Sequence, residues 1–238
     1  MITVVIKRTD EPKVIQMTQE DLVRQLGSIS GAEIILEDTW GEGLKKVRTP
    51  YVSLVEADCV FSANYYSSNY GLMKKLQPRV SDPSLTTAEH GGGGDMKLAM
   101  ITSCLGIRDF GNRIYSYRLD KVEQGNDELA LKSWHIQPDR DKHTMELYQV
   151  QVGFVPGAVI RMSAIKDIIE DELWYGGDLI KLSTALSFYL WNTGRRIRVN
   201  PNTTYVSSDM NLESPPLFEV KVPDRVGNIF QQEGIGLL

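Results

Sequence analysis

The sequence predicts an α/β protein with a mixed, mostly parallel central sheet flanked by helices, and an antiparallel hairpin region in its second half. Over residues 1–80, short apolar runs alternate with helical segments, a pattern typical of βαβ units. Between residues 112 and 152, short β-prone segments are separated by charged turns, which favours antiparallel hairpins. With 238 residues, 42% hydrophobic and 24% charged, the chain has an ordinary globular composition.

The first 80 residues alternate predicted strands and helices. Apolar, β-branched runs predict strands at residues 2–6, 32–38 and 51–55. A first helix is expected to begin at Thr18, which has Asp21 three positions on in the manner of a capping box. Residues 41–47 predict a loop with a short helix. Ser62 is the expected N-cap of a third helix, which runs to Leu76.

A polar stretch, residues 81–97, separates these elements from the rest, and its four glycines, Gly91–Gly94, predict a mobile connection. A central strand is expected at 97–107. "PGAVIRMSAIKDIIE" then predicts a strand followed by a helix that Ser163 caps. Apolar residues at helical spacing predict the clearest helix, Asp178 to Trp191.

Gly194 is the expected stop of that helix, and a short strand is predicted at 196–201. Because no linker divides the chain cleanly, we expect residues 1–206 to form a single domain. It would have one half at 1–80 and another at 96–206, followed by a C-terminal tail, residues 207–238.

Composition narrows the classes of function. A formal charge of −5 and a pI near 5.3 argue against binding nucleic acid by charge alone. The apolar runs are shorter than the ~18–20 residues that cross a bilayer, and the opening stretch resembles neither a signal nor a transit peptide. Cys59 and Cys104 lie in apolar surroundings without metal-ligand spacing, so we expect buried free thiols. Together these features predict a cytoplasmic protein without membrane insertion.

Acidic residues follow two of the predicted strands. Glu37 and Asp38 end the second strand, and Glu56 and Asp58 end the third. Ligands of open α/β sheets bind outside the carboxyl ends of the strands. If the backbone stays extended, Glu56 and Asp58 point the same way and could share a divalent cation, which completes its shell with water and phosphate oxygens. The alternative is that they are surface acids that end a strand and cap the next helix.

The chain resembles GT-A glycosyltransferases, and in particular the large inverting family 2, in four stretches that occur in the family's order. These are "ITVVIKRTD", "AEIILEDTWGEGLKKVRTPYVSLVEADCVFS", "VPGAVIRMSAIKDI" and "YGGDLIKLSTALSFYLWNTGRRIRVNPNTTYV". The second contains E-A-D where the family has D-x-D. In the fourth, Asp178 stands where the family has the acid that leads its closing helix. The resemblance implies a GT-A-like fold and transfer of a sugar from a nucleotide-diphosphate-sugar donor to an acceptor hydroxyl.

The resemblance also implies roles for individual residues. Asp58 would bind a divalent cation, Mn²⁺ or Mg²⁺, and the donor diphosphate, while Glu56 would contact ribose or the cation's water shell. Asp178 would be the general base that takes the proton of the acceptor hydroxyl. Residues 1–80 would form the nucleotide-binding half and residues 96–206 the acceptor half. Further donor contacts would come from Thr9, Asp10, Glu37, Asp38 and Lys45 or Lys46.

The sequence departs from the family's pattern at three places. The first acid of the motif is Glu56, and only Asp178 stands where the family has an acid pair, with Asp171 and Glu172 as rival candidates. A histidine that often completes the metal site is replaced by Ser207, Ser208 and Asp209.

Two other functions therefore stay open. One is a catalytically silent GT-A-like protein that serves binding or assembly. The other is a sugar nucleotidyltransferase, which the lack of glycines after the first strand disfavours. The acceptor of a transferase could be a protein, a modified nucleic-acid base or a saccharide.

Overall fold

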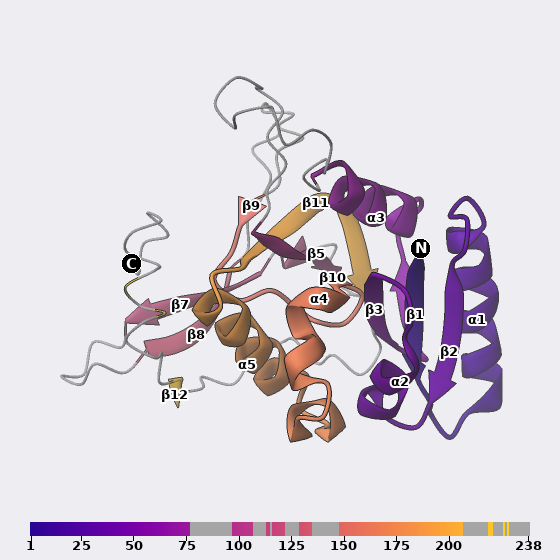
Figure 1. Cartoon of the computed structure of the whole chain (residues 1–238), viewed down its shortest axis with the longest axis horizontal. Helices are drawn as coiled ribbons and strands as arrows, with labels where there is room; N and C mark the ends of the chain where they lie inside the picture. Colours follow the sequence, from indigo (N-terminus) through magenta and orange to yellow (C-terminus); the bar gives the residue numbers. More distant parts are fainter. Residues whose placement is uncertain are drawn as a thin grey trace.

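The structure is a computed structural model that describes residues 1–76, 97–106, 113–114, 116–121, 129–134, 148–206, 219–220, 226 and 228. Its main sheet has nine strands, seven of which follow the path β2-β1-β3-β10-β5-β11-β4, with β6 beside β5 and β9 beside β11 (Figure 1). Their bounds are β1 (Ile2–Lys7), β2 (Glu33–Glu37), β3 (Tyr51–Glu56), β4 (Val60–Phe61), β5 (Leu98–Gly106), β6 (Arg113–Ile114), β9 (Tyr148–Gln149), β10 (Val159–Arg161) and β11 (Arg196–Val206).

Strand directions confirm the predicted fold class. β1 is parallel to both β2 and β3, and β5 is parallel to β11. β10 is antiparallel to its neighbours β3 and β5, so these five other strands all run the same way. The predicted hairpin region contributes the antiparallel pair β7 (Ser116–Lys121) and β8 (Leu129–Trp134). β12 (Glu219–Val220), from the predicted tail, adds to β8 and completes a second sheet of three antiparallel strands.

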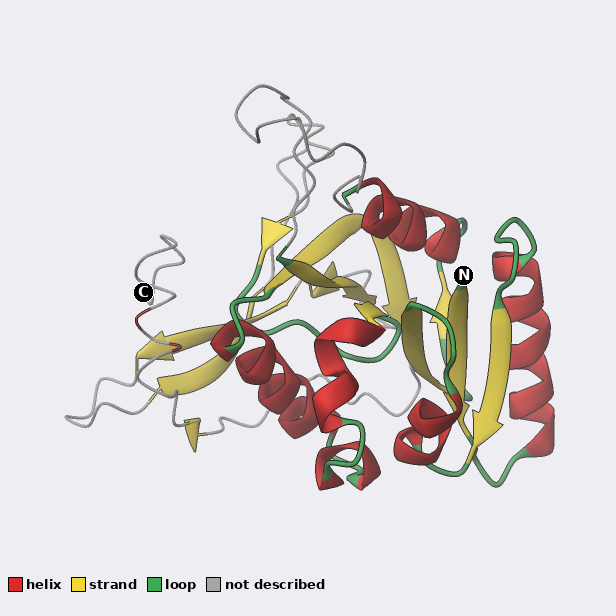
Figure 2. Ribbon diagram, in the orientation of Figure 1, coloured by secondary structure: helices red, strands yellow, loops and turns green. Residues whose placement is uncertain are grey.

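Helices cover both faces of the main sheet, as the ribbon in Figure 2 shows. They are α1 (Pro12–Leu26), α2 (Trp40–Lys46), α3 (Tyr65–Lys75), α4 (Met162–Ile165), α5 (Leu179–Asn192) and the 3₁₀ turns η1 (Lys166–Ile168) and η2 (Glu172–Tyr175). Ser53 bonds the Tyr66 hydroxyl of α3, and Val4, its partner in register, shares that face. Val5 therefore points to the other face, where it packs against Gly43 of α2.

Three predicted helix starts are wrong. α1 begins at Pro12, because proline suits a first helical turn, and Thr18 lies buried in the helix, where its hydroxyl donates to the Ala57 carbonyl. α3 begins at Tyr65, and the Ser62 hydroxyl instead accepts a 2.9 Å hydrogen bond from the Thr204 amide of β11.

The helix predicted at Ser163 also begins earlier, at Met162, directly after Arg161, which is still extended at the end of β10. By contrast, α5 starts after its cap Asp178 and stops before Gly194, whose φ of 76° is the left-handed conformation expected of a helix stop. β11 is longer than predicted and has a register irregularity between Asn200 and Thr204.

A buried polar network lies between α3, β5 and β11. We call it the Asn69 network; its members are Asn69, Ser103, Asn200 and Thr203. The Asn69 amide donates to Ser103 Oγ at 3.0 Å and accepts from Asn200 Nδ2 at 2.8 Å and from Thr203 Oγ1 at 3.2 Å. Ser103 and Thr203 bond each other at 2.9 Å. These bonds hold the irregular part of β11 against α3.

The glycine run Gly91–Gly94 and most of the tail predicted at 207–238 lie outside the described residues. Within the described part of the chain, no helix has the length and apolar character that crossing a membrane requires.

Candidate functional site

The carboxyl ends of β1, β2 and β3 meet at one edge of the sheet. The chain leaves β1 for β2 on one side, then crosses back to β3 on the other, which makes the boundary between β1 and β3 a topological switch point. Lys7 is in register with both Glu37 and Glu56, so the three strands end at one level. In an open α/β sheet this is the position where ligands bind.

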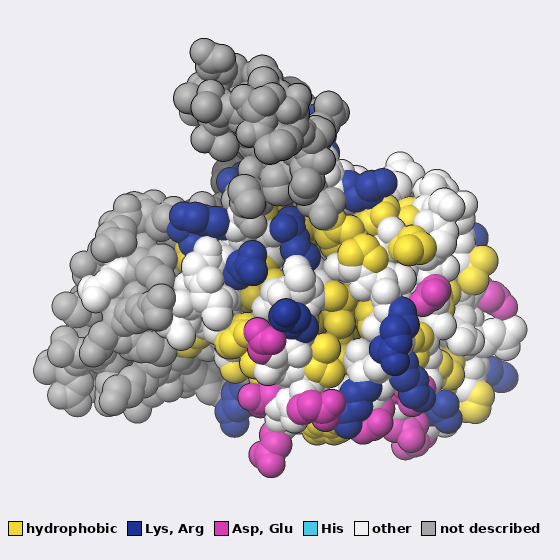
Figure 3. Space-filling view, in the orientation of Figure 1, with side chains coloured by type: hydrophobic (Ala, Val, Ile, Leu, Met, Phe, Trp, Pro, Cys, Tyr) yellow, Lys and Arg dark blue, Asp and Glu magenta, His cyan; other side chains and the backbone are white. Residues whose placement is uncertain are grey.

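Charged side chains of both signs gather on this part of the surface. In Figure 3, Asp and Glu lie along the lower margin of the face shown, and several Lys and Arg lie among them below the ends of β1–β3 in Figure 1. The ion pairs Arg8–Asp38 and Lys46–Glu37 belong to this mixture of charges.

Glu56 and Asp58 flank a turn. Glu56 ends β3, and the Cys59 amide donates to the Glu56 carbonyl at 3.4 Å, so the backbone turns at Ala57 instead of staying extended. Both acids are half-buried, whereas Ala57 between them is fully buried. Strand alternation would make Glu56 and Asp58 point the same way only in an extended backbone, and the backbone here is turned. A ligand shared by the two side chains therefore stays a prediction.

The Cys59 thiol lies close to both acids. Burial raises its pKa, and the negative charges of Asp58 and Glu56 raise it further. A thiol held in its neutral form is a poor nucleophile. Cys59 and Cys104 are both free and buried, as predicted.

The acids that end β2 are engaged by cations of the same chain. Asp38 forms an exposed 3.4 Å ion pair with Arg8, and Glu37 pairs with Lys46. At the end of β1, Thr9 Oγ1 accepts a 3.1 Å bond from the Glu11 amide, and Asp10 is exposed. A nucleotide contact at Glu37 or Asp38 would therefore compete with an existing, solvent-exposed ion pair.

Helix α2 starts directly at the switch point. Thr39 caps it by accepting a 3.2 Å bond from the Glu42 amide. Trp40 is buried and donates from Nε1 to the Val55 carbonyl of β3 at 3.1 Å, and the Lys7 ammonium of β1 lies 5.7 Å from its ring centroid. The first turn of α2 is thus attached to the ends of both β1 and β3.

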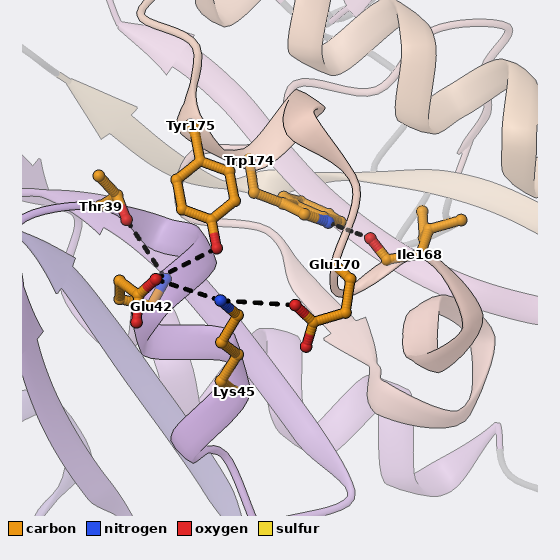
Figure 4. A network of polar contacts seen from close by, with 7 residues as sticks. All are labelled: Thr39, Glu42, Lys45, Ile168, Glu170, Trp174 and Tyr175. Carbon is orange, nitrogen blue, oxygen red and sulfur yellow. Dashed lines mark hydrogen bonds and ion pairs between the residues drawn. The ribbon is translucent and has the colours of Figure 1, made fainter.

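A second set of contacts attaches the η2 segment to α2 (Figure 4). The Tyr175 hydroxyl donates to Glu42 at 3.3 Å, and Lys45 forms ion pairs with Glu42 at 3.2 Å and Glu170 at 3.4 Å. The Tyr175 ring lies so close to Gly41 that a Cβ there would overlap it. We call Gly41, Glu42, Lys45, Glu170 and Tyr175 the Tyr175 clasp.

The clasp is electrostatically coupled. The Tyr175 hydroxyl and the Glu42 carboxylate raise the pKa of Lys45 above its ordinary value, and Lys45 lowers the pKa of Glu42. Lys45, predicted as a phosphate contact, therefore joins two distant parts of the chain in this structure. It is a solvent-exposed contact that salt would screen.

Asp178 lies three residues after Tyr175. Its Oδ1 accepts hydrogen bonds from the amides of Ile180, at 3.1 Å, and Lys181, at 3.0 Å, and its Oδ2 lies 3.4 Å from the Lys181 ammonium. The rival acid Asp171 caps η2 through the Leu173 amide. The predicted base thus also caps α5.

A divalent cation fits the donor set only in part. Among the described residues no three acid, histidine or cysteine side chains gather as a metal cluster. Ser207, Ser208 and Asp209 lie outside those residues. Mg²⁺, however, is commonly held by one or two carboxylates, with water and substrate phosphates completing its shell. Glu56 and Asp58 supply that number of carboxylates, and their use as cation ligands stays a prediction.

Sequence reasoning missed the clasp, although one signal was present. Thr39 and Glu42 have the T-x-x-E spacing of a capping box, which marks the start of α2. No local pattern relates Gly41 to Tyr175, since the two residues are 134 positions apart in the sequence.

No protein-family model matches the chain, and no curated protein does either. Among solved structures, one of GalNAc-T7 with UDP, GalNAc and Mn²⁺ is 11% identical over 87% of this chain, with a TM-score of 0.49. One of S. aureus TarS 1–349 is 10% identical over 87%, with a TM-score of 0.46. This chain spans 43% and 60% of those two chains.

Proposed function

We propose that this protein is a glycosyltransferase that moves a sugar from a nucleotide-diphosphate-sugar to an acceptor hydroxyl. The observation that carries the proposal is the switch point between β1 and β3. There Glu56, the first residue of the E-A-D motif, ends β3 in register with Lys7 of β1, which is itself in register with Glu37 of β2. Residues 1–80 would bind the donor, with Thr9, Asp10, Glu37 and Asp38 near its base and ribose. The four stretches that resemble inverting family 2 enzymes support the same assignment.

Glu56 and Asp58 would hold a divalent cation, Mn²⁺ or Mg²⁺, beside the donor diphosphate. When bound, the cation would stabilise the charge that develops on the departing diphosphate. Asp178 would accept the proton of the attacking hydroxyl through Oδ2, which is exposed beside the Lys181 ammonium at 3.4 Å, because Oδ1 already accepts two amides. Residues 96–206 would form the half of the domain that binds the acceptor. The acceptor would be a protein, a modified nucleic-acid base or a saccharide.

A catalytically silent binding or assembly protein is the second candidate. Three observations favour it: Glu37 and Asp38 are paired with cations of the chain, Lys45 belongs to the clasp, and Asp178 caps α5. Each of these groups has a structural use that needs no substrate. The two functions differ in whether a nucleotide and a cation bind together.

A thermal-shift screen of UDP, GDP, CDP and dTDP, each with and without Mn²⁺, tests the proposal. One nucleotide should raise Tm by about 4 °C when it is present with Mn²⁺ at roughly ten times its Kd, because a ligand that binds only the native state stabilises it. The variant Asp58→Asn should lose this shift while its fold stays intact. Glu20→Gln, on the exposed side of α1, is the matched control and should keep it. A shift that survives Asp58→Asn, or none with any nucleotide, would favour the binding protein.

A further inference from the structure

Tyr51 and Arg161 face each other at the amino edge of the same sheet, far from the proposed donor site. They are directly opposed in the antiparallel pair of β3 and β10, so their side chains share one face. It is the face that α3 covers, because the Tyr51 ring packs edge-on against Tyr70 with centroids 5.5 Å apart. Tyr51 and Glu56 are the two ends of β3, about 17 Å apart for five steps of an extended strand.

Both side chains have buried polar atoms without a hydrogen-bond partner. Over the described part of the chain, the Tyr51 hydroxyl and Arg161 Nε and Nη2 are buried and unpaired. Tyr51 is 2% exposed, whereas Arg161 as a whole is half-buried and keeps part of its side chain in solvent. Burial raises the pKa of Tyr51, and the nearby Arg161 charge opposes that rise, so the two groups interact.

Unpaired buried donors of this kind are costly. A buried donor without an acceptor loses its bonds to water, and a buried charge loses more. Arg196 shows the usual solution in this chain: it is 7% exposed, donates from Nη1 to the carbonyls of Gly194 and Arg195, and lies over the Trp191 ring. Arg161 has no such contacts in the described structure.

The two unpaired nitrogens of Arg161 indicate what would satisfy them. Nε and Nη2 lie on one edge of the planar guanidinium, and their N–H bonds are parallel. That edge matches two oxygens of a carboxylate or a phosphate, which it binds in a bidentate manner. The Tyr51 hydroxyl can donate a third hydrogen bond to the same group. Tyr70, which packs against Tyr51, also has the Lys74 ammonium 5.6 Å from its ring centroid.

We propose that Tyr51 and Arg161 form a second binding site, which takes the oxyanion of a ligand, a phosphate or a carboxylate group. The site lies at the opposite edge of β3 from Glu56 and does not depend on sugar transfer. Its ligand is held by a bidentate contact to Arg161 Nε and Nη2 and by the Tyr51 hydroxyl.

The test is a titration with inorganic phosphate and, separately, with acetate, against chloride at matched ionic strength and without nucleotide or Mn²⁺. Thermal shift and calorimetry should show binding of phosphate or acetate beyond the chloride baseline. The anion that binds more tightly identifies the ligand group as a phosphate or a carboxylate. Arg161→Met should raise the Kd at least about tenfold, because the charge-assisted bidentate contact is lost. Tyr51→Phe should weaken binding less, since it removes one neutral donor.

Arg24→Met is the matched control, because Arg24 is exposed on α1 with its own ion pair to Asp21, and it should bind as the wild type does. Unliganded Arg161→Met should unfold at a Tm no lower than the wild type, because a costly unpaired charge is gone. Equal binding by wild type and Arg161→Met, or no binding of either anion by the wild type, would overturn the proposal. If Arg161→Met fails to fold, the wild-type titrations and Tyr51→Phe decide.

Discussion

The Asn69 network and the Tyr175 clasp both join segments that are distant in sequence, but by different means. The Asn69 network is buried and uncharged, and its amide bonds three side chains at 2.8 to 3.2 Å. The clasp is exposed and charged, with Tyr175 41% exposed and ion pairs of 3.2 and 3.4 Å. Buried hydrogen bonds are costly to break, whereas exposed ion pairs contribute little stability. The comparison suggests that the network holds the fold together and that the clasp positions η2 and Asp178.

Removing the centre of the Asn69 network should have the largest effect. Asn69→Ala removes the three buried hydrogen bonds to Ser103, Thr203 and Asn200 and leaves a cavity, so the free energy of unfolding should fall by about 2–4 kcal/mol. Urea denaturation followed by circular dichroism measures it. Asn64→Ala is unsuitable as a control, because Asn64 has a left-handed φ of 58°; Ser67→Ala on the exposed side of α3 serves instead. A loss under about 0.5 kcal/mol would contradict the role of the network.

Filling the space under Tyr175 should have the next largest effect. Gly41→Val places methyl groups where the Tyr175 ring lies, and overpacking of this kind costs about 1–3 kcal/mol. The double variant Gly41→Val with Tyr175→Ala should recover stability because the overlap is gone, yet transfer should stay impaired, since η2 is no longer seated. A double variant with full transfer activity would show that the seating of η2 does not matter.

Asp178 allows its two roles to be separated. Asp178→Ala removes the cap of α5 and should cost about 0.5–2 kcal/mol, whereas Asp178→Asn keeps a side chain that caps equally well. Both variants should lose glycosyl transfer, because neither retains a carboxylate to accept the proton. Urea unfolding and a transfer assay in parallel decide. Full transfer by Asp178→Asn would leave Asp178 as a cap and move the search for the base to Asp171 and Glu172.

The smallest effect concerns charge in the clasp. Lys45 depresses the pKa of Glu42 below its ordinary 4.5, so the ionised form is favoured in the folded state. Its contribution should be present above pH 4.5 and be lost as pH falls through the depressed value. The wild type should therefore slightly exceed Glu42→Gln in Tm at neutral pH and low salt, and the difference should vanish in acid or at high salt. A difference that persists in acid would exclude the ion pair as its cause.

The strands and the fold class were predictable because buried strands have a recognisable run of apolar residues in the sequence. The runs at 2–6 and 51–55 are apolar at nearly every position, as strands covered on both faces require, and they became β1 and β3. Asp178 and Gly194 bracket α5 as predicted, because caps and stops act through neighbouring backbone groups. The acids that follow the predicted strands β2 and β3 could be placed at one edge of the sheet, because the carboxyl ends of parallel strands meet at one edge.

Other residues were misjudged because their partners are remote. Ser62 has the chemistry of a cap but bonds Thr204, and Thr18 bonds the Ala57 carbonyl. For Ser62 and Thr18 the capping chemistry was recognised, and the partner was not. Lys45 stays a predicted donor contact, and nothing nearby in sequence indicated Glu170 as its ion-pair partner.

By itself, the sequence determined the α/β class, the alternation of early strands and helices, the buried thiols and the acids at the strand ends, because periodicity and residue type act over a few neighbours. Only the tertiary structure decided that Gly41 seats Tyr175, that Asn69 holds β11, and that Tyr51 and Arg161 meet with donors unpaired. Those contacts join positions far apart in the chain. They exist only once the strands have paired in register and the helices have packed on the sheet.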